Sequence, residues 1–390
     1  MKYPVADGEI VFNGSQDAPK FYLLGGYSQN FFQNAVNWIQ EYDVLLDTWR
    51  VFPYFMDKPR SSFVASMWDS NLVYFGGTDD NSLQSIKIFA QNEPSVFDTN
   101  KTFNRKNASG NVVGNNLVII GGTDERGKEV LPFIVNYDLT QKQRVASFTF
   151  LNYFDNTQDL MTAAVGNQIF IVGGLNNNTL TNTVNRYNIP DNKLTLMTQR
   201  IKSPRAGGCA VYNAMLNKIF VIGGYDELSS ALSTVEIITI NSDGTLKISN
   251  GPSLQYPRKY PMAVSYKDKI YVFGGFDKNN QVVAKVEVFS DTVTTGVPGS
   301  NIPGEFALMQ NYPNPFNPST KIKFDLPEGS DVKLQVYNVL GEEVATLVNG
   351  ILPPGSHEVK FDATRLASGV YIYMIRAGNF VQVKKMLLMK

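Results

Sequence analysis

The hexapeptide IFVIGG at residues 219–224 joins four β-branched or aromatic residues to a pair of glycines. An apolar run ending in Gly-Gly recurs five more times: FYLLGG (21–26), LVYFGG (72–77), LVIIGG (117–122), IFIVGG (169–174) and IYVFGG (270–275). The first glycines of the six pairs are separated by 51, 45, 52, 50 and 51 residues. Chance can supply one such run, but not six at this spacing. A fixed period near ~50 residues with several short strands per unit is typical of a β-propeller.

The residues around each run predict four strands per unit. The run itself is apolar throughout, as expected of a strand whose two faces are both covered by neighbouring sheets. The glycine pair allows positive φ angles and a close approach to the next backbone. In the first unit further strands are expected at 36–43 and 48–53, and three later runs follow Pro-Arg turns at 59–60, 204–205 and 257–258. Six units of four strands predict a six-bladed, all-β propeller.

The ends of the repeat predict how the ring starts and closes. PVADGEIVFNG (4–14) matches the pattern of PRAGGCAVYNA (204–214), so the chain begins at the first strand of a blade. The sixth unit shows three strands between about 261 and 289. We expect its fourth strand within 291–308, because an open sheet edge favours aggregation. A strand from residues preceding Met1, or a three-stranded blade, are the alternatives.

These repeats resemble the kelch family over residues 4–290. The resemblance rests on the apolar-Gly-Gly run, then Tyr42-Asp43 with Trp49 six residues after the aspartate, then Pro-Arg. It is strongest in the first unit, because Trp49 is the only tryptophan kept at this position.

The hydrophobic pattern changes after residue 290. Residues 291–304 are rich in Ser, Thr, Gly and Pro without a period, which is typical of a linker. Alternating segments with turns between them then fill 305–390 and predict six or seven strands in a small Ig-like antiparallel β-sandwich. The predicted domains are therefore a propeller at 1–290, a linker at 291–304 and a sandwich at 305–390.

The sandwich closely resembles the C-terminal sorting domain of type IX secretion cargo, the FlgD-like Ig-type group (type A). The motifs are QNYPNPFNP (310–318), VYNVLG (336–341), LASGVY (366–371) and the Lys-Lys-Met near the end. The residues that carry the sorting motif are Asn311, Pro313, Pro315, Phe316, Pro318, Gly341, Gly369, Tyr371, Lys384 and Lys385. An Ig-like stalk or a carbohydrate-binding module is the alternative for a sandwich without these motifs.

The resemblance implies export. A protein with this domain crosses the inner membrane with a signal peptide, folds in the periplasm of a Bacteroidetes-type bacterium and is recognised by the outer-membrane machinery through 305–390. It is then secreted or held at the outer cell surface, often after cleavage near the linker. The segment MKYPVADGE has no hydrophobic signal region, so we expect a signal peptide that has been removed rather than cytoplasmic residence.

Composition excludes several classes of function. Lys+Arg and Asp+Glu both number 35, so the chain has no excess positive charge that would favour binding to nucleic acid. The single cysteine, Cys209, excludes an internal disulfide framework and multi-cysteine metal sites. A catalytic triad, a zinc site or a histidine-ligated copper centre would have to be built around the single histidine, His357. No apolar run is long enough for a transmembrane segment, and no calcium-loop motif is present. We therefore expect no metal and no cofactor.

The loops that follow the Gly-Gly pairs are expected on one face of the propeller, where they suit a protein or glycan partner. The candidate ligand-binding residues are Tyr27, Phe31, Phe32, Arg60, Asp124, Arg205, Tyr225, Arg258 and Phe276. The aromatic side chains can bind a partner or pack on neighbouring blades. The arginines can bind a ligand or tie the loops between blades.

Three functions fit this pattern: non-catalytic binding of a protein or glycan, a sugar-acting enzyme similar to kelch mutarotases, and a structural surface or adhesion component. An acid/base site needs only a carboxylate with suitable partners. Copper chemistry like that of galactose oxidase is excluded, because the propeller contains no histidine. We expect binding rather than catalysis.

Overall fold

The structure is a computed structural model of the 390-residue chain. It describes residues 1–28, 34–78, 85–90, 93–99, 103–124, 126, 128, 133–148, 157–290, 294–295, 305–326, 330–352, 355–378 and 380–389. The chain forms two compact units, Met1–Val297 and Pro298–Lys390. Strands dominate both units, and no helix of the described part is long and apolar enough to span a bilayer.

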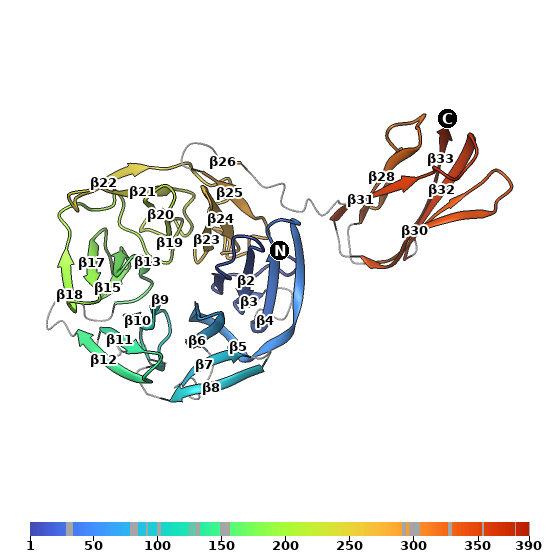
Figure 1. Ribbon diagram of the computed structural model, residues 1–390. Helices are drawn as coiled ribbons and strands as arrows, with labels where there is room; N and C mark the ends of the chain where they lie inside the picture. Colours follow the sequence, from blue (N-terminus) through green and yellow to red (C-terminus); the bar gives the residue numbers. More distant parts are fainter. Residues whose placement is uncertain are drawn as a thin grey trace. The chain divides into compact units, whose positions relative to one another are not determined.

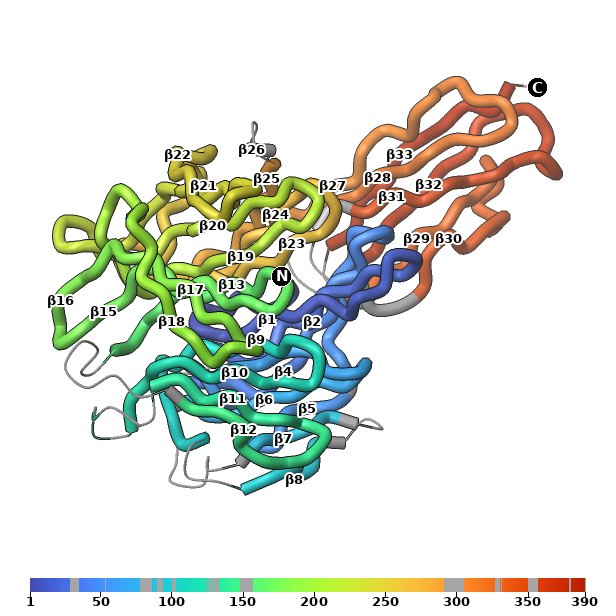
Figure 2. Tube along the Cα trace, turned by 60° about the vertical axis from the view of Figure 1, so that its left-hand side comes forward, coloured from blue at the N-terminus to red at the C-terminus, as the bar shows by residue number. Residues whose placement is uncertain are grey.

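The first unit is a ring of six antiparallel blades (Figure 1), the first two of which share one continuous sheet, and this confirms the predicted propeller. Each blade uses consecutive strands, running from the innermost to the outermost. Blades 1 and 2 comprise β1 (Glu9–Phe12), β2 (Lys20–Leu24), β4 (Asn34–Asp43), β5 (Thr48–Trp68), β6 (Asn71–Thr78), β7 (Ser85–Ala90) and β8 (Glu93–Thr99), with β3 (Tyr27–Ser28) paired to β4. Blade 3 comprises β9 (Ser109–Val113), β10 (Asn116–Ile120), β11 (Ile134–Asp138) and β12 (Gln143–Phe148), which lie side by side in Figure 2.

The remaining three blades repeat this order. Blade 4 comprises β13 (Met161–Val165), β14 (Gln168–Val172), β17 (Val184–Asn188) and β18 (Lys193–Leu196), with a short hairpin of β15 (Leu175–Asn176) and β16 (Thr179–Leu180). Blade 5 comprises β19 (Cys209–Asn213), β20 (Lys218–Ile222), β21 (Val235–Ile240) and β22 (Leu246–Asn250). Blade 6 comprises β23 (Met262–Tyr266), β24 (Lys269–Phe273), β25 (Glu287–Phe289) and β26 (Thr294–Thr295).

Two features refine the predicted strands. The fourth strand of blade 1 and the first strand of blade 2 are one continuous strand, β5, which pairs with β4 up to Arg60 and with β6 from Ser61. The fourth strand of blade 6 is β26, which lies within the segment where it was expected. The propeller therefore extends into the first residues of the predicted linker.

The apolar runs are strands whose two faces are both covered by neighbouring blades. In β10, β14, β20 and β24 the four residues before Gly-Gly are all buried. Side chains of alternate residues point to opposite faces, so each run contributes to two hydrophobic clusters. Leu117 and Ile119 pack toward blade 2, whereas Val118 and Ile120 pack toward blade 4. Burial on both faces explains why these runs contain no polar residue.

Both glycines of every pair have positive φ, between 51° and 107°. The first glycine also lies against the next blade: a Cβ on Gly76 would stand 2.3 Å from the carbonyl oxygen of Arg105. No side chain fits there, so the pair is required by geometry.

Four buried arginines, Arg60, Arg105, Arg205 and Arg258, join neighbouring blades. The backbone carbonyl of each accepts a hydrogen bond from the second glycine of the preceding blade, as from Gly224 to Arg258 at 2.8 Å. Its guanidinium donates to the first glycine carbonyl of its own blade, as from Arg258 to Gly274 at 2.8 Å. The prediction that the Pro-Arg arginines tie inter-blade loops agrees with these contacts.

The acids that neutralise these arginines differ between blades. Glu236 and Glu287, on the third strands of blades 5 and 6, pair with Arg205 and Arg258 at 2.9 and 2.8 Å. Both carboxylates are buried, and each also accepts backbone N–H groups two and three residues before its arginine. In blade 2 the acid is Asp57, which pairs with Arg60 at 3.0 Å.

Blade 1 carries neither an arginine nor an acid at the corresponding positions. The carbonyl of Val5 lies against Gly274, where blades 2, 3, 5 and 6 present an arginine carbonyl and blade 4 presents that of Thr157. Gln40 takes the position of the glutamates and exchanges two hydrogen bonds with the backbone of Tyr3, at 2.9 and 2.8 Å. An uncharged amide suffices because no guanidinium needs a counter-charge.

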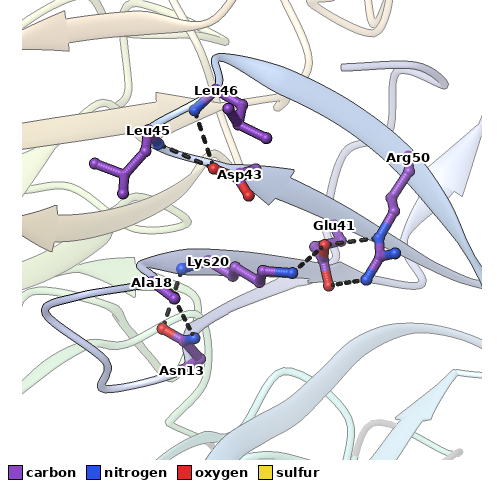
Figure 3. Close-up of polar contacts among 8 residues, drawn as sticks. All are labelled: Asn13, Ala18, Lys20, Glu41, Asp43, Leu45, Leu46 and Arg50. Carbon is purple, nitrogen blue, oxygen red and sulfur yellow. Dashed lines mark hydrogen bonds and ion pairs between the residues drawn. The ribbon is translucent and has the colours of Figure 1, made fainter.

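Blade 1 is further held by the polar contacts in Figure 3. Glu41 lies between Lys20 at 2.9 Å and Arg50 at 2.7 Å. Burial acts to raise the pKa of Glu41, but hydrogen bonds from Arg50 and Lys20 outweigh it and lower that pKa. Asp43 caps the following turn by accepting the N–H groups of Leu45 and Leu46.

The second unit is the predicted sandwich of two antiparallel sheets. One sheet contains β27 (Ala307–Leu308), β28 (Ser319–Leu326) and β31 (Gly355–Asp362), and the other contains β30 (Glu343–Leu352), β29 (Ser330–Tyr337), β32 (Gly369–Ala377) and β33 (Phe380–Leu388). Its core is formed by inward residues of both sheets, among them Ile322, Phe324, Leu334, Tyr373 and Ile375.

We predict that Arg258→Met lowers the free energy of unfolding of the propeller by about 3–5 kcal/mol, because it leaves Glu287 buried without its cation. The double variant Arg258→Met/Glu287→Gln recovers at least half of this loss, because it reproduces the neutral arrangement of blade 1. Urea unfolding followed by tryptophan fluorescence measures this selectively, since Trp38, Trp49 and Trp68 all lie in the propeller. A double variant as unstable as the single one contradicts the argument.

Candidate functional site

Six residues with left-handed backbone form a circle at the start of the innermost strands. They occupy one position per blade, two residues after the arginine or its replacement, and their φ angles lie between 51° and 58°. They are Asp7, Ser62, Asn107, Asp159, Gly207 and Tyr260. Only glycine adopts this conformation freely, so five of these positions carry a backbone cost.

Backbone hydrogen bonds connect the six residues into a closed ring, here called the hydrogen-bonded ring. The N–H of each residue donates to the carbonyl of the residue in the preceding blade. The donor–acceptor distances are 3.1 Å for Ser62 to Asp7, 3.2 Å for Asn107 to Ser62, 3.2 Å for Asp159 to Asn107, 3.0 Å for Gly207 to Asp159, 2.6 Å for Tyr260 to Gly207 and 3.2 Å for Asp7 to Tyr260. The last bond joins blade 1 to blade 6.

The ring surrounds one end of a central cavity of about 390 Å³. The cavity continues along the innermost strands and is lined by residues of all six blades, including Glu9, Ser109, Thr162 and Cys209. Its volume lies within the range of small-molecule sites, ~300–1,000 Å³.

Asp159 is the most connected side chain of the ring. One carboxylate oxygen, Oδ2, accepts hydrogen bonds from the hydroxyls of Tyr225 at 2.8 Å and Tyr260 at 3.0 Å. A Cβ on Gly207 would stand 2.7 Å from the ring of Tyr225 and 2.9 Å from that of Tyr260. The glycine therefore leaves the space through which both tyrosines reach Asp159.

Burial raises the pKa of all three acids at the cavity. It raises the pKa of Asp159 despite the two tyrosine hydrogen bonds, and raises that of Asp7 to about 7 despite a hydrogen bond from Ser62. The charge of Asp159 adds to the effect on Asp7. Burial and the nearby Asp7 also raise the pKa of Glu9 well above its ordinary value. Carboxyl groups with such pKa values are typical of functional sites.

The ring can therefore offer both donors and acceptors near neutral pH. A protonated Asp7 donates a hydrogen bond, whereas Oδ2 of Asp159 accepts hydrogen bonds from Tyr225 and Tyr260. The hydroxyl of Ser62 and the amide of Asn107 add neutral polar groups. Among the described residues no group of three or more His, Cys, Asp or Glu is arranged to hold a metal ion.

Cys209 lies in β19 and lines the cavity. Burial raises the pKa of its thiol to about 12, so the thiol stays protonated at neutral pH. A thiol of this kind is a poor nucleophile.

The described aromatic residues predicted to bind a ligand differ in the contacts that they make. Tyr225 belongs to the site through Asp159. Tyr27 and Phe276 pack against each other, with ring centroids 5.9 Å apart. Phe31 and Phe32 lie outside the described residues.

The predicted charged candidates do not line this cavity. Arg60, Arg205 and Arg258 are buried in the inter-blade contacts described above, so their side chains present no surface for a ligand. Asp124 caps its own loop, where its Oδ1 accepts the N–H groups of Arg126 and Lys128, both at 2.9 Å. Those backbone hydrogen bonds lower the pKa of Asp124.

The sorting-motif residues lie in the sandwich. Asn311, Phe316 and Tyr371 are buried, and Tyr371 donates its hydroxyl hydrogen bond to Ala367 at 2.8 Å. Gly369 and Lys384 are half-buried, whereas the other five motif residues are exposed: Pro313, Pro315, Pro318, Gly341 and Lys385.

Sequence reasoning missed Asp7, Asp159 and Tyr260. The signal was present, because each stands two residues after the arginine position of its repeat. The signal is hard to recognise because the side chain at that position differs between blades: it is a carboxylate, a hydroxyl, an amide or, in glycine, a hydrogen. Aligning the six repeats on Gly-Gly and asking where polar residues recur reveals it.

Comparison with known proteins finds a family match within each unit. The KLHDC2/KLHL20/DRC7 Kelch-repeats domain matches residues 160–297, and the Secretion system C-terminal sorting domain matches residues 310–389. The chain is 24% identical over 231 residues to the Kelch repeat and BTB domain-containing protein 1 of Camelpox virus (strain CMS), covering 57% of this chain and 39% of the viral protein. The chain thus spans less than half of that relative's length.

A solved structure, that of YjhT, shares the fold. The superposition has a TM-score of 0.56 at 13% identity and covers 74% of this chain and 95% of YjhT. At this identity the likeness supports the fold alone.

We predict that Asp7 makes the propeller less stable as pH rises. Because its pKa is higher in the folded protein than the ordinary value of 3.8, its contribution is full below pH ~4 and is lost as pH rises through about 7, at up to about 1.4 kcal/mol per pH unit. Asp7→Asn removes this slope, so the variant gains stability relative to the parent between pH 5 and pH 8. Urea unfolding at several pH values measures the difference. Asp124→Asn is the control, and an equal gain in both variants contradicts the assignment.

Proposed function

We propose that the chain is a secreted or cell-surface kelch-repeat protein, exported through its type IX C-terminal sorting domain, whose propeller binds a glycan at the hydrogen-bonded ring. The observation that carries the proposal is the set of carboxyl, hydroxyl and amide groups of Asp7, Ser62, Asn107, Asp159 and Tyr260 around one cavity. Sugar hydroxyls both donate and accept hydrogen bonds, so they match a site that offers both.

The sorting domain sets where this binding takes place. It engages the type IX secretion machinery, which delivers the protein to the medium or the cell surface. A glycan-binding propeller in that position meets extracellular or surface polysaccharide. A protein partner that inserts a polar loop into the cavity is the other form of the binding function.

Two variants test the binding site. Asp159→Asn removes the carboxylate charge but keeps an oxygen for Tyr225 and Tyr260, and Tyr225→Phe removes one hydroxyl. Each is expected to weaken glycan binding about tenfold to a hundredfold, because a polar ligand group loses its partner. A glycan array with the full chain finds the ligand, and calorimetry with the best oligosaccharide measures the affinities.

Asp124→Asn is the matched control, because Asp124 caps its own loop outside the cavity. Binding that survives both ring variants unchanged contradicts the proposed site. Absence of any glycan or protein ligand, together with self-assembly of the protein, favours the structural role instead.

A sugar-acting enzyme is the second candidate, and the pKa of Asp7 favours it. A carboxyl group with a pKa of about 7 is suited to exchange protons at neutral pH. In a mutarotase-like reaction one carboxyl group protonates the ring oxygen while a carboxylate removes the proton of the anomeric hydroxyl. The bond between the ring oxygen and the anomeric carbon then breaks, and the sugar opens to its carbonyl form.

NMR exchange of anomeric signals distinguishes the two candidates. Catalysis requires faster interconversion with the protein than without it, and loss of that acceleration in Asp7→Asn. A sugar that binds without any acceleration supports binding alone.

A further inference from the structure

The outer surface of the first sorting-domain sheet is charged. On β28 and β31 the outward positions carry Lys321, Lys323, Glu358 and Lys360. Lys321 and Lys323 both pair with Glu358, at 2.6 and 3.3 Å. Such polar outward residues are expected of an antiparallel sheet with one face in water.

The outer surface of the other sheet departs from this pattern on its last two strands. The residues of β32 and β33 that alternate with the core positions are largely apolar, and we call the following six the apolar patch: Val370, Ile372, Met374, Val381, Val383 and Leu387. They form cross-strand neighbours, since Val370 faces Leu387 and Met374 faces Val383. Val381 and Val383 are 50% and 52% exposed, and Val370 is 44% exposed.

Two cations lie within the apolar patch. Lys385 is the cross-strand neighbour of Ile372, and Arg376 is the neighbour of Val381. β32 and β33 contain no aspartate or glutamate. The patch is therefore apolar and positive, in contrast to the mixed charges of the opposite sheet.

Folding does not require valine at these positions. The core is already filled by the inward residues of the same strands, such as Tyr373, Ile375 and Met386. Threonine has the same β-branched shape and serves equally well on a solvated strand. A contiguous exposed apolar group on an edge strand is a liability for a free protein and is typical of an interaction surface.

The sorting motif supports the strand that carries this surface. The N–H of Phe316 donates to the carbonyl of Leu387 at 3.0 Å, and the N–H of Met389 donates to the carbonyl of Phe316 at 3.0 Å. The side chain of Asn314 accepts the N–H of Leu387 at 2.9 Å. The proline-rich segment at the start of the domain therefore holds β33, its last strand, in place.

From the exposure, charge and position of these residues we propose that the apolar patch is the surface by which the sorting domain docks on the type IX secretion machinery. The partner is a protein of that machinery whose docking surface presents apolar side chains next to carboxylates. The apolar side chains cover the patch, and the carboxylates pair with Arg376 and Lys385. The proposal rests on the sorting function of this domain and adds to it the surface that is recognised.

Export of the full chain from a bacterium with a type IX system tests the proposal. The measured quantity is the ratio of protein in the medium and on the surface to protein in the periplasm. The triple variant Val370→Thr/Val381→Thr/Val383→Thr keeps the shape and strand propensity of each residue, and its export ratio is expected to fall about tenfold. The matched control, Lys321→Gln/Lys323→Gln/Lys360→Gln, changes three outward residues of the opposite sheet and is expected to be exported like the parent.

The charges are tested separately. Arg376→Glu/Lys385→Glu is expected to be retained in the periplasm, whereas Arg376→Lys/Lys385→Arg keeps export. Limited proteolysis of the periplasmic protein establishes that each variant is folded, and the single variants Val381→Thr and Val383→Thr replace the triple if it is not. Export of folded triple and charge-reversed variants at the parental ratio overturns the proposal.

A deletion of residues 305–390 separates this outcome from failure of the sorting function itself. If the deletion stops export but the patch variants do not, another surface of the domain is recognised. If the deletion is exported like the parent, the sorting function fails and the docking proposal fails with it.

Discussion

The propeller depends on six backbone hydrogen bonds that form a closed ring around its axis. Each bond joins neighbouring blades, and the bond from Asp7 to Tyr260 joins the first blade to the last. Within the described residues every blade is built from consecutive strands, so no strand is exchanged between the two ends of the chain. Closure therefore relies on this ring and on the hydrophobic cluster between blades 6 and 1. The requirement fixes a left-handed residue at one position in every repeat.

Because the hydrogen-bonded ring fixes the backbone, residues at other positions can differ between blades, provided that the residues they contact differ as well. Arg258 with Glu287 and Val5 with Gln40 solve the same packing problem, one with a charge pair and one without charge. Asp57 supplies the carboxylate for Arg60 from a different segment, while Lys87 occupies the strand position of the glutamates and pairs with Asp57 at 3.1 Å. The repeat pattern fades along the sequence because the geometry is conserved among blades while the chemistry is not.

The sequence was sufficient to predict the six sheets, the strand with which the chain begins and the sandwich that follows. These depend on local patterns, namely an apolar run and two glycines that no other residue can replace. Arg105 was missed because asparagine, not proline, precedes it. The candidate site was predicted only through Tyr225, since Asp7, Asp159 and Tyr260 meet there from segments roughly a hundred or more residues apart along the chain. No single segment encodes such a meeting. It follows only from comparing the six repeats, because ring closure brings the equivalent position of every blade together.

Both proposed sites lie where the chain departs from what folding favours. At the ring, burial opposes ionisation of Asp7 and Asp159, and uncharged residues would avoid that cost. On the sorting domain, outward valines add exposed apolar surface without adding to a core that is already filled. A sequence whose local choices otherwise agree with its fold is expected to break that agreement at functional sites. The two departures differ in kind, polar groups inside a cavity and apolar groups on a surface, as expected if the first site binds the proposed hydrated ligand and the second the proposed protein partner.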